Sequence, residues 1–198
     1  SGGPAQRHLE KAGALDPTVP EYRLALADLA LRQGRLPNAV QGFESVLKLQ
    51  DNHPRALLGL ARCHRAQYQF DQAIQRYKQV LQAMPGESEA ERELAEVQLQ
   101  VGQPESALSS LTRVAESEPE NAEGWLAVAQ AAEEGENLSR ALDAYQRALR
   151  LDDSNHSVWA RLAQVQARGQ QLEDALHSLT RAAELEPGEV AYPMASID

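Results

Sequence analysis

The sequence predicts an all-α protein built from a series of stacked helical hairpins. Three observations lead to this fold class: residue types recur every 34 residues, apolar residues within each unit follow helical spacing, and helix-forming residues dominate the composition. Alanine, leucine, glutamine, glutamate and arginine are abundant, and all of them favour helices. No stretch alternates apolar and polar residues as a half-buried strand requires, so we expect almost no β-sheet.

A fixed period of 34 residues is the strongest signal in the sequence. Alanine recurs at this step at Ala5, Ala39, Ala73, Ala107, Ala141 and Ala175. A large apolar residue recurs at Phe43, Tyr77, Leu111, Tyr145 and Leu179. No insertion or deletion interrupts the register, which indicates a repeat protein. The period predicts a half unit followed by five full units, at residues 4–19, 20–53, 54–87, 88–121, 122–155 and 156–189.

Each unit is predicted to fold as two antiparallel helices, and residues 21–33 and 37–49 of the first full unit illustrate the pattern. Apolar residues in both segments recur at steps of three and four, as one face of a helix requires. Gly34 ends the first helix, and Pro37 occupies the first turn of the second. A single hairpin cannot bury its apolar face alone, so neighbouring hairpins must stack on one another.

Three units depart from the glycine pattern at the end of the first helix. Tyr68 replaces the glycine in the second unit, and the glycine comes one residue early in the fourth and fifth, as Gly135 and Gly169. We expect small changes of helix length at these places and no change of fold.

Both ends of the chain are expected to lie outside the repeats. Residues 1–3 are predicted to be a remnant of trimming or disordered, and Pro193 stops any sixth unit, so residues 190–198 are predicted to be extended or disordered. Apolar ends of a repeat array would favour association with another copy.

Two units carry enough of the repeated columns to be compared with a known repeat. One set consists of Trp125, Val128, Ala129, Ala141, Tyr145 and Ala148. The other consists of Trp159, Leu162, Ala163, Ala175, Leu179, Ala182 and Pro187. The pattern resembles the tetratricopeptide repeat over roughly residues 4–188. This resemblance implies a right-handed α-α superhelix, or solenoid, in which residues 4–189 form a single array. It also implies that the first helices line a concave groove for a protein or peptide.

A stripe of residues opposite the core columns of each first helix is the candidate groove surface. The stripe is nearly neutral, whereas the rest of the chain is strongly acidic. Four arginines on it come from two neighbouring first helices: Arg55, Arg62, Arg65 and Arg92. We expect them to accept carboxylates, because a guanidinium group binds a carboxylate through paired hydrogen bonds. The alternative is that they pair with Glu89, Glu93 and Glu96 and contribute little. The full set of candidate groove residues is Arg55, Leu58, Arg62, Arg65, Arg92, Glu96, Leu126, Gln130, Arg161 and Arg168.

Composition and motifs argue against several other functions. The net charge of −10 disfavours nucleic acid as a partner, and no apolar run is long enough for a membrane span. The histidines lack metal-ligand spacing, and Cys63 falls in an apolar column as a buried hydrophobe. We therefore predict no catalytic residue, no metal and no cofactor. Trp125 and Trp159 are expected to pack in the core, whereas Glu133 and Glu134 are expected to form a solvated helix end.

The sequence does not name a compartment or a partner. A cytoplasmic location is slightly favoured by the single cysteine, and a periplasmic one stays open if a targeting segment was removed. The predicted function is a non-catalytic scaffold or adaptor that binds another protein or peptide, with an acidic segment or a carboxylate as the candidate ligand. Two alternatives stay open: a self-associating structural protein that builds oligomers through its ends, and a regulatory arm of a larger protein.

Overall fold

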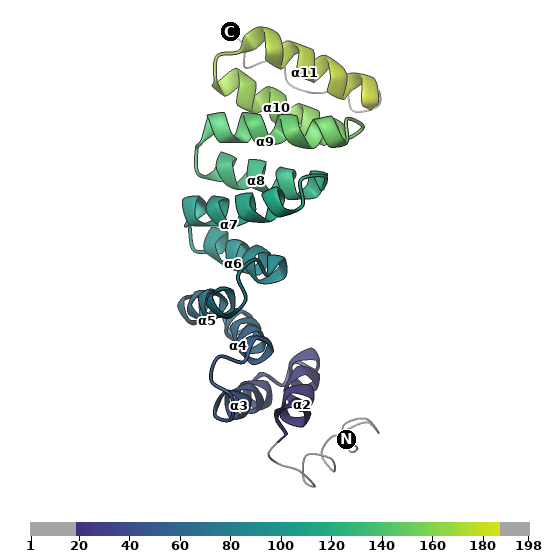
Figure 1. Cartoon of the computed structure of the whole chain (residues 1–198). Helices are drawn as coiled ribbons and strands as arrows, with labels where there is room; N and C mark the ends of the chain where they lie inside the picture. Colours follow the sequence, from purple (N-terminus) through teal and green to yellow (C-terminus); the bar gives the residue numbers. More distant parts are fainter. Residues whose placement is uncertain (1–18, 187–198) are drawn as a thin grey trace. The chain divides into compact units, whose positions relative to one another are not determined.

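The computed structural model describes residues 19–186, which form helices joined by short turns (Figure 1). Ten helices and no strand occur among these residues, so the prediction of an all-α fold is confirmed. The predictions for residues 1–3, for the half unit up to residue 18 and for residues 187–198 lie outside the described range.

First and second helices alternate along the chain. The first helices are α2 (Pro20–Arg32), α4 (Pro54–Ala66), α6 (Ser88–Gln100), α8 (Ala122–Glu134) and α10 (His156–Arg168). The second helices are α3 (Leu36–Leu47), α5 (Phe70–Ala83), α7 (Pro104–Ser117), α9 (Leu138–Leu151) and α11 (Leu172–Leu185). Every first helix has 13 residues. Successive first helices begin 34 residues apart, so the helices keep the register of the sequence repeat.

The turn after each first helix has the same backbone conformation whichever residue occupies it. The positions with a positive φ in these turns are Gly34, Tyr68, Gly102, Glu136 and Gln170. Gly135 and Gly169 have φ values of −81° and −83°, so they do not form the left-handed turn. The expectation of altered helix lengths is therefore wrong. The fold keeps the turn and holds three side chains in a conformation that costs roughly 1–2 kcal/mol each.

Asparagine caps start several helices of the second half of the chain. The side-chain oxygen of Asn121 accepts hydrogen bonds from the backbone N–H groups of Glu123 and Gly124. Asn155 and Asn137 cap α10 and α9 in the same way. Each cap satisfies backbone donors that a helix start leaves without intrahelical partners. These side chains therefore reinforce the helix starts that the apolar pattern defines.

The chain divides into two compact units, residues 1–101 and 102–198, and each is described by itself. In the first unit, each of the helices α2 to α6 packs against the next. Fully buried members of its repeated columns are Ala39, Phe43, Ala73 and Tyr77. In the second unit, each of the helices α7 to α11 likewise packs against the next. The corresponding residues there, almost completely buried, are Ala107, Ala141, Tyr145 and Ala175.

Two glycines allow close helix packing in the first unit. A Cβ atom on Gly59 would lie 2.2–2.6 Å from ring atoms of Phe43. A Cβ atom on Gly42 would lie 2.7 Å from the Cβ atom of Ala27. Phe43 is completely buried, so its ring cannot retreat into solvent. Helix α3 therefore approaches α2 at Gly42 and α4 at Gly59, where only a hydrogen atom fits.

Candidate functional site

Two cavities lie along the predicted stripe of the first unit. The larger has a volume of about 510 Å³, and the residues that line it include Leu31, Arg62, Arg65, Tyr68, Glu96 and Gln100. The smaller has a volume of about 360 Å³, and the residues that line it include Asp28, Leu31, Arg55, Leu58, Arg62 and Glu89. Leu31 and Arg62 line both cavities. The stripe of α2, α4 and α6 is therefore a hollowed surface, which we call the first-unit groove.

Arg62 is the most firmly held residue of the first-unit groove. The Nε atom of Arg62 lies 3.0 Å from both carboxylate oxygens of Glu93, and its Nη2 atom lies 2.8 Å from Oε1 of the same carboxylate. The same guanidinium group lies 2.8 Å from Glu89. Hydrogen bonding to Glu93 is the main cause of the raised pKa of Arg62. Two carboxylates from α6 therefore fix an arginine of α4 in one orientation.

Glu93 is itself held by a core residue of the preceding helix, α5. The side chain of Glu93 is 15% exposed, and the hydroxyl of Tyr77 donates a 2.8 Å hydrogen bond to its Oε2 atom. Burial, followed by this hydrogen bond, raises the pKa of Tyr77. Tyr77, Glu93 and Arg62 thus form a chain of hydrogen bonds that runs from the core to the groove.

Arg55 and Arg65 are held more loosely than Arg62. A terminal nitrogen of Arg55 lies 3.1 Å from Asp28, and the side chain of Arg55 is 70% exposed. A terminal nitrogen of Arg65 lies 2.8 Å from Glu96. Together with the pairs of Arg62, these contacts match the alternative interpretation in which the arginines pair with Glu89, Glu93 and Glu96. Asp28 is a further partner that was not predicted.

The other candidate residues of the first unit differ in position. Leu58 is half-buried and lines the smaller cavity, and Glu96 lines the larger. Arg92 is exposed on α6 and lines neither cavity. The structure therefore brings Arg55, Arg62 and Arg65 to the groove, whereas Arg92 is not part of either cavity.

The second unit has a related arrangement around Glu133. The hydroxyl of Tyr145 donates a 2.8 Å hydrogen bond to Oε2 of Glu133. Arg161 and Arg168 approach Oε1 at 3.7 and 3.8 Å. The side chain of Glu133 is 16% exposed, so the expectation of a solvated glutamate is wrong here, although Glu134 is exposed. The sequence held a signal for this contact, because a tyrosine in a buried column needs an acceptor for its hydroxyl.

Candidate residues of the second unit share a cavity of about 420 Å³. The residues that line it are Gln130, Glu133, Glu134 and Arg161. Arg168 reaches the same carboxylate without lining the cavity. Leu126 is half-buried and does not line this cavity. The predicted stripe of α8 and α10 therefore also holds a hollow, with two exposed arginines beside one carboxylate.

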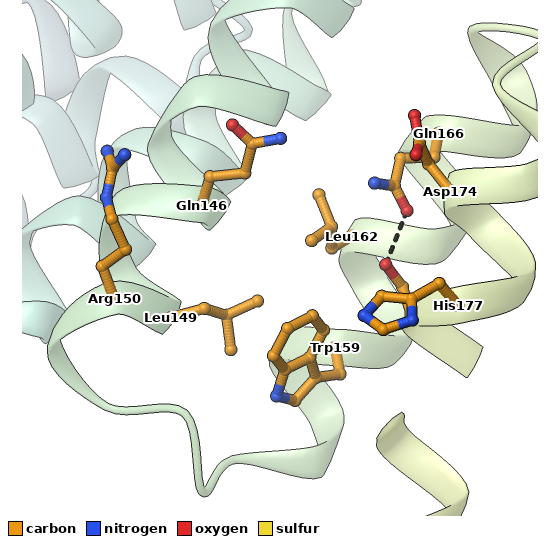
Figure 2. A pocket seen from close by; sticks show the side chains of 9 residues that line it. Gln146, Leu149, Arg150, Trp159, Leu162, Gln166, Asp174 and His177 are labelled. Carbon is orange, nitrogen blue, oxygen red and sulfur yellow. Dashed lines mark hydrogen bonds between the residues drawn. The ribbon is translucent and has the colours of Figure 1, made fainter. Parts of the chain in front are cut away.

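The two tryptophans of the repeat differ in exposure. Trp125 is 5% exposed, as expected for a core residue, and its indole N–H donates to the carbonyl of Pro119 at 3.0 Å. Trp159 is half-buried and lines a cavity of about 360 Å³ between α9, α10 and α11 (Figure 2). Trp159 is thus more exposed than predicted, since the prediction of core packing rested on the repeat position that it shares with Trp125.

The described residues form no cluster of metal ligands, and their one cysteine is buried. Within residues 19–186, no group of three or more histidine, cysteine, aspartate or glutamate side chains could hold a metal ion. Cys63 is buried, as predicted, and burial raises the pKa of its thiol to about 11. None of the ten described helices has both the length and the apolar character needed to cross a membrane.

The repeated hairpins and the hollowed faces of their first helices define a helical-repeat protein. Models of the tetratricopeptide repeat match residues 5–54, 24–88, 64–131 and 122–165. These matches together run from residue 5 to residue 165. The chain therefore belongs to the tetratricopeptide repeat family, as the repeat pattern predicted. A search of curated proteins finds no match.

Several solved structures share the fold. YrrB, described as a tetratricopeptide repeat protein with an unusual peptide-binding site, has a TM-score of 0.78 and 19% identity, and the match covers 91% of this chain and 93% of YrrB. MamA has a TM-score of 0.74 and 16% identity, with 90% and 98% covered. MamA from Desulfovibrio magneticus RS-1 has a TM-score of 0.70 and 21% identity, with 87% and 97% covered. At identities of 16–21%, the likeness to these structures shows a shared fold and no more.

Proposed function

We propose that this chain is a non-catalytic interaction module that binds an extended segment of a partner protein in the first-unit groove. The observation that carries the proposal is the pair of cavities that share Leu31 and Arg62 along α2, α4 and α6. An extended segment suits neighbouring hollows because successive side chains can enter them in turn. The peptide-binding site named for YrrB supports the same class of function.

The arginines indicate the chemistry of the bound segment. Arg55 and Arg65 each bond one carboxylate through one nitrogen, so the rest of each guanidinium group can donate to a guest. Arg62, fixed by Glu89 and Glu93, supplies a rigid wall between them. We infer that carboxylate or carbonyl oxygens of the partner bind at Arg55 and Arg65.

A peptide-binding experiment with charge-reversal variants tests the proposal. An array of acidic, neutral and basic ten-residue peptides is the probe, and fluorescence anisotropy measures binding. Arg55→Glu combined with Arg65→Glu should remove binding of acidic peptides, because both donors become acceptors. Arg62 stays in place, so the half-buried Glu93 keeps its partner.

A matched control reverses the same number of charges away from the groove. Lys48→Glu combined with Lys78→Glu changes two exposed lysines at the C-terminal cap of α3 and on α5. This variant should bind acidic peptides like the original chain. Equal loss of peptide binding in both variants would show that overall charge, and not the groove, causes the effect. Equal binding by the original chain and both variants would overturn the groove assignment.

A second candidate function is self-association through α11. Leu172 and Leu176 are 49% and 53% exposed on this helix, and exposed leucines on one helix are typical of an interface. Leu176→Glu should then reduce the mass that light scattering measures at high protein concentration. A mass of one copy at every concentration would exclude this function.

A further inference from the structure

The cavity beside Trp159 lies on different helix faces from the groove residues of the second unit. Leu149 of α9, Leu162 of α10 and His177 of α11 line it together with the indole ring. Second helices thus contribute to this cavity, whereas the cavity at Gln130, Glu133 and Arg161 is lined by first helices alone. We call it the Trp159 cleft. A ligand bound in this cleft would therefore leave the first-helix surface open.

One side of the Trp159 cleft is a rigid aromatic wall. The indole N–H of Trp159 donates to the carbonyl of Asp153 at 2.9 Å. The His177 ring meets the indole ring edge-on, with centroids 6.4 Å apart. The guanidinium carbon of Arg181 lies 6.0 Å from the indole centroid. Three contacts thus fix the ring, so a guest side chain would meet a preformed apolar surface.

A buried amide at the inner end of the cleft lacks a partner for one of its two polar atoms. Gln166 is 5% exposed, and its Oε1 atom accepts a 2.7 Å hydrogen bond from the hydroxyl of Ser178. Its Nε2 atom points into the cleft and forms no hydrogen bond to any described residue (Figure 2). A guest that displaces water from this donor has to offer an oxygen in its place, so the amide favours a guest that carries an acceptor.

We propose that the Trp159 cleft binds a tyrosine side chain of a partner protein. A tyrosine ring is an apolar body that packs against Leu149, Leu162 and the indole, and its phenolic oxygen accepts from Nε2 of Gln166. The cleft volume of about 360 Å³ lies at the lower end of ligand pockets, which suits one aromatic side chain. A phenylalanine would displace water from the amide of Gln166 without supplying an acceptor.

Two matched small probes test the proposal on the full chain. N-acetyl-tyrosine amide and N-acetyl-phenylalanine amide differ only in the hydroxyl, and NMR follows the Trp159 indole N–H and the Gln166 side-chain amide. We expect the tyrosine probe to bind roughly three- to tenfold more tightly, as one added hydrogen bond provides. The Gln166 amide signal should shift with the tyrosine probe alone. Equal affinities, or a Gln166 signal that neither probe moves, would overturn the proposal.

A double substitution removes the hydrogen-bonded pair of Gln166 and Ser178 without leaving either group unpaired. Gln166→Leu with Ser178→Ala replaces both hydrogen-bonding partners by apolar groups, a change that folds tolerate well. The preference for the tyrosine probe should disappear in this variant and remain in Gln146→Leu, which changes an exposed residue at the cleft rim. A preference that survives the double substitution would overturn the assignment of Gln166.

One competing occupant is a tyrosine of the chain itself. Tyr192 follows the described residues and belongs to the same molecule. If the tyrosine probe binds only after Tyr192→Ala, the cleft belongs to that residue, and the proposal of a partner protein is overturned. Probe binding to the unchanged chain supports the partner.

Discussion

The hydroxyl of Tyr77 on α5 donates a 2.8 Å hydrogen bond to Glu93 on α6, and Glu93 in turn holds Arg62 on α4. Tyr145 occupies the same repeat position in the second unit and bonds Glu133 at 2.8 Å. In both units a core tyrosine thus orients a glutamate that faces the arginines of the first helices. Each contact leads to a prediction about stability.

The tyrosine hydroxyls should make stability fall at high pH. The folded chain raises the pKa of Tyr77 and of Tyr145, mainly by burial. The folded state therefore holds these protons more tightly than the unfolded state, whose tyrosines titrate near 10. Their contribution is fully present below about pH 10 and decreases as the pH rises further.

The pH effect is measured with tyrosine-to-phenylalanine variants. Urea unfolding of Tyr77→Phe with Tyr145→Phe should give a free energy of unfolding that falls less steeply above pH 10 than in the original chain. At neutral pH each substitution should cost about 1–2 kcal/mol, because a half-buried carboxylate loses a donor. Tyr68→Phe, at a position that is 81% exposed, should leave the free energy of unfolding at neutral pH unchanged.

Arg62 should matter more for stability than Arg65, although both are paired. Arg62→Ala leaves Glu93 half-buried without its fork of hydrogen bonds, and we expect a loss of roughly 1–3 kcal/mol. Arg65→Ala breaks a more exposed pair and should cost about 0–1 kcal/mol. Chemical denaturation of the two variants side by side measures the difference. Equal losses would contradict the anchoring role of Glu93.

Glycine at the left-handed turns of the second unit should stabilise the chain. Glu136→Gly and Gln170→Gly relieve side chains at φ values of 55° and 60°. We expect a net gain of about 0.5–1 kcal/mol each, since the glycine also adds entropy to the unfolded chain. Gly34→Ala, at a φ of 69°, is the opposite change and should lower the melting temperature.

Tyr68→Gly should separate stability from binding. The residue has a φ of 59°, is 81% exposed and lines the larger cavity of the first-unit groove. Glycine removes the backbone strain, so the melting temperature should rise, whereas the loss of the ring should weaken peptide binding. Unchanged binding in the anisotropy assay would remove Tyr68 from the groove surface.

Gly59→Ala should destabilise the first unit strongly. The added methyl group would lie within 2.6 Å of the completely buried Phe43 ring, and overpacking of this kind costs typically about 1–3 kcal/mol. Gly124→Ala is the control, because its nearest neighbours would be 3.6 Å away and alanine favours helices. Its free energy of unfolding should stay the same or rise. The reverse order would contradict the packing at Gly59.

The repeat pattern predicted the hairpins well because burial repeats with the register. Phe43, Tyr77 and Tyr145 are completely buried, as large residues in one column should be. Local backbone geometry was not predictable from the positions of glycine alone. After α8 the residue with a positive φ is Glu136 and not Gly135, because all five first helices keep the same length.

The candidate site was predictable in outline and not in its contacts. The stripe of first-helix residues indicated a surface along which two cavities lie, since helical spacing fixes which side chains share a face. Which carboxylate each arginine selects depends on side-chain reach between helices, so the pair of Arg55 with Asp28 was missed. The cleft at Trp159 was missed because Trp159 shares its repeat position with Trp125, so both residues were predicted to pack in the core.

The ion pairs of the first unit join different hairpins. Arg55 bonds Asp28 of the preceding first helix, while Arg62 and Arg65 bond Glu93 and Glu96 of the following one. Such pairs strengthen the coupling between nearest neighbours, which governs how cooperatively a repeat protein unfolds. A chimaera that replaces the hairpin at residues 54–83 must therefore bring basic residues that match Asp28 on one side and Glu93 and Glu96 on the other. Otherwise the transplanted segment would melt separately from its neighbours.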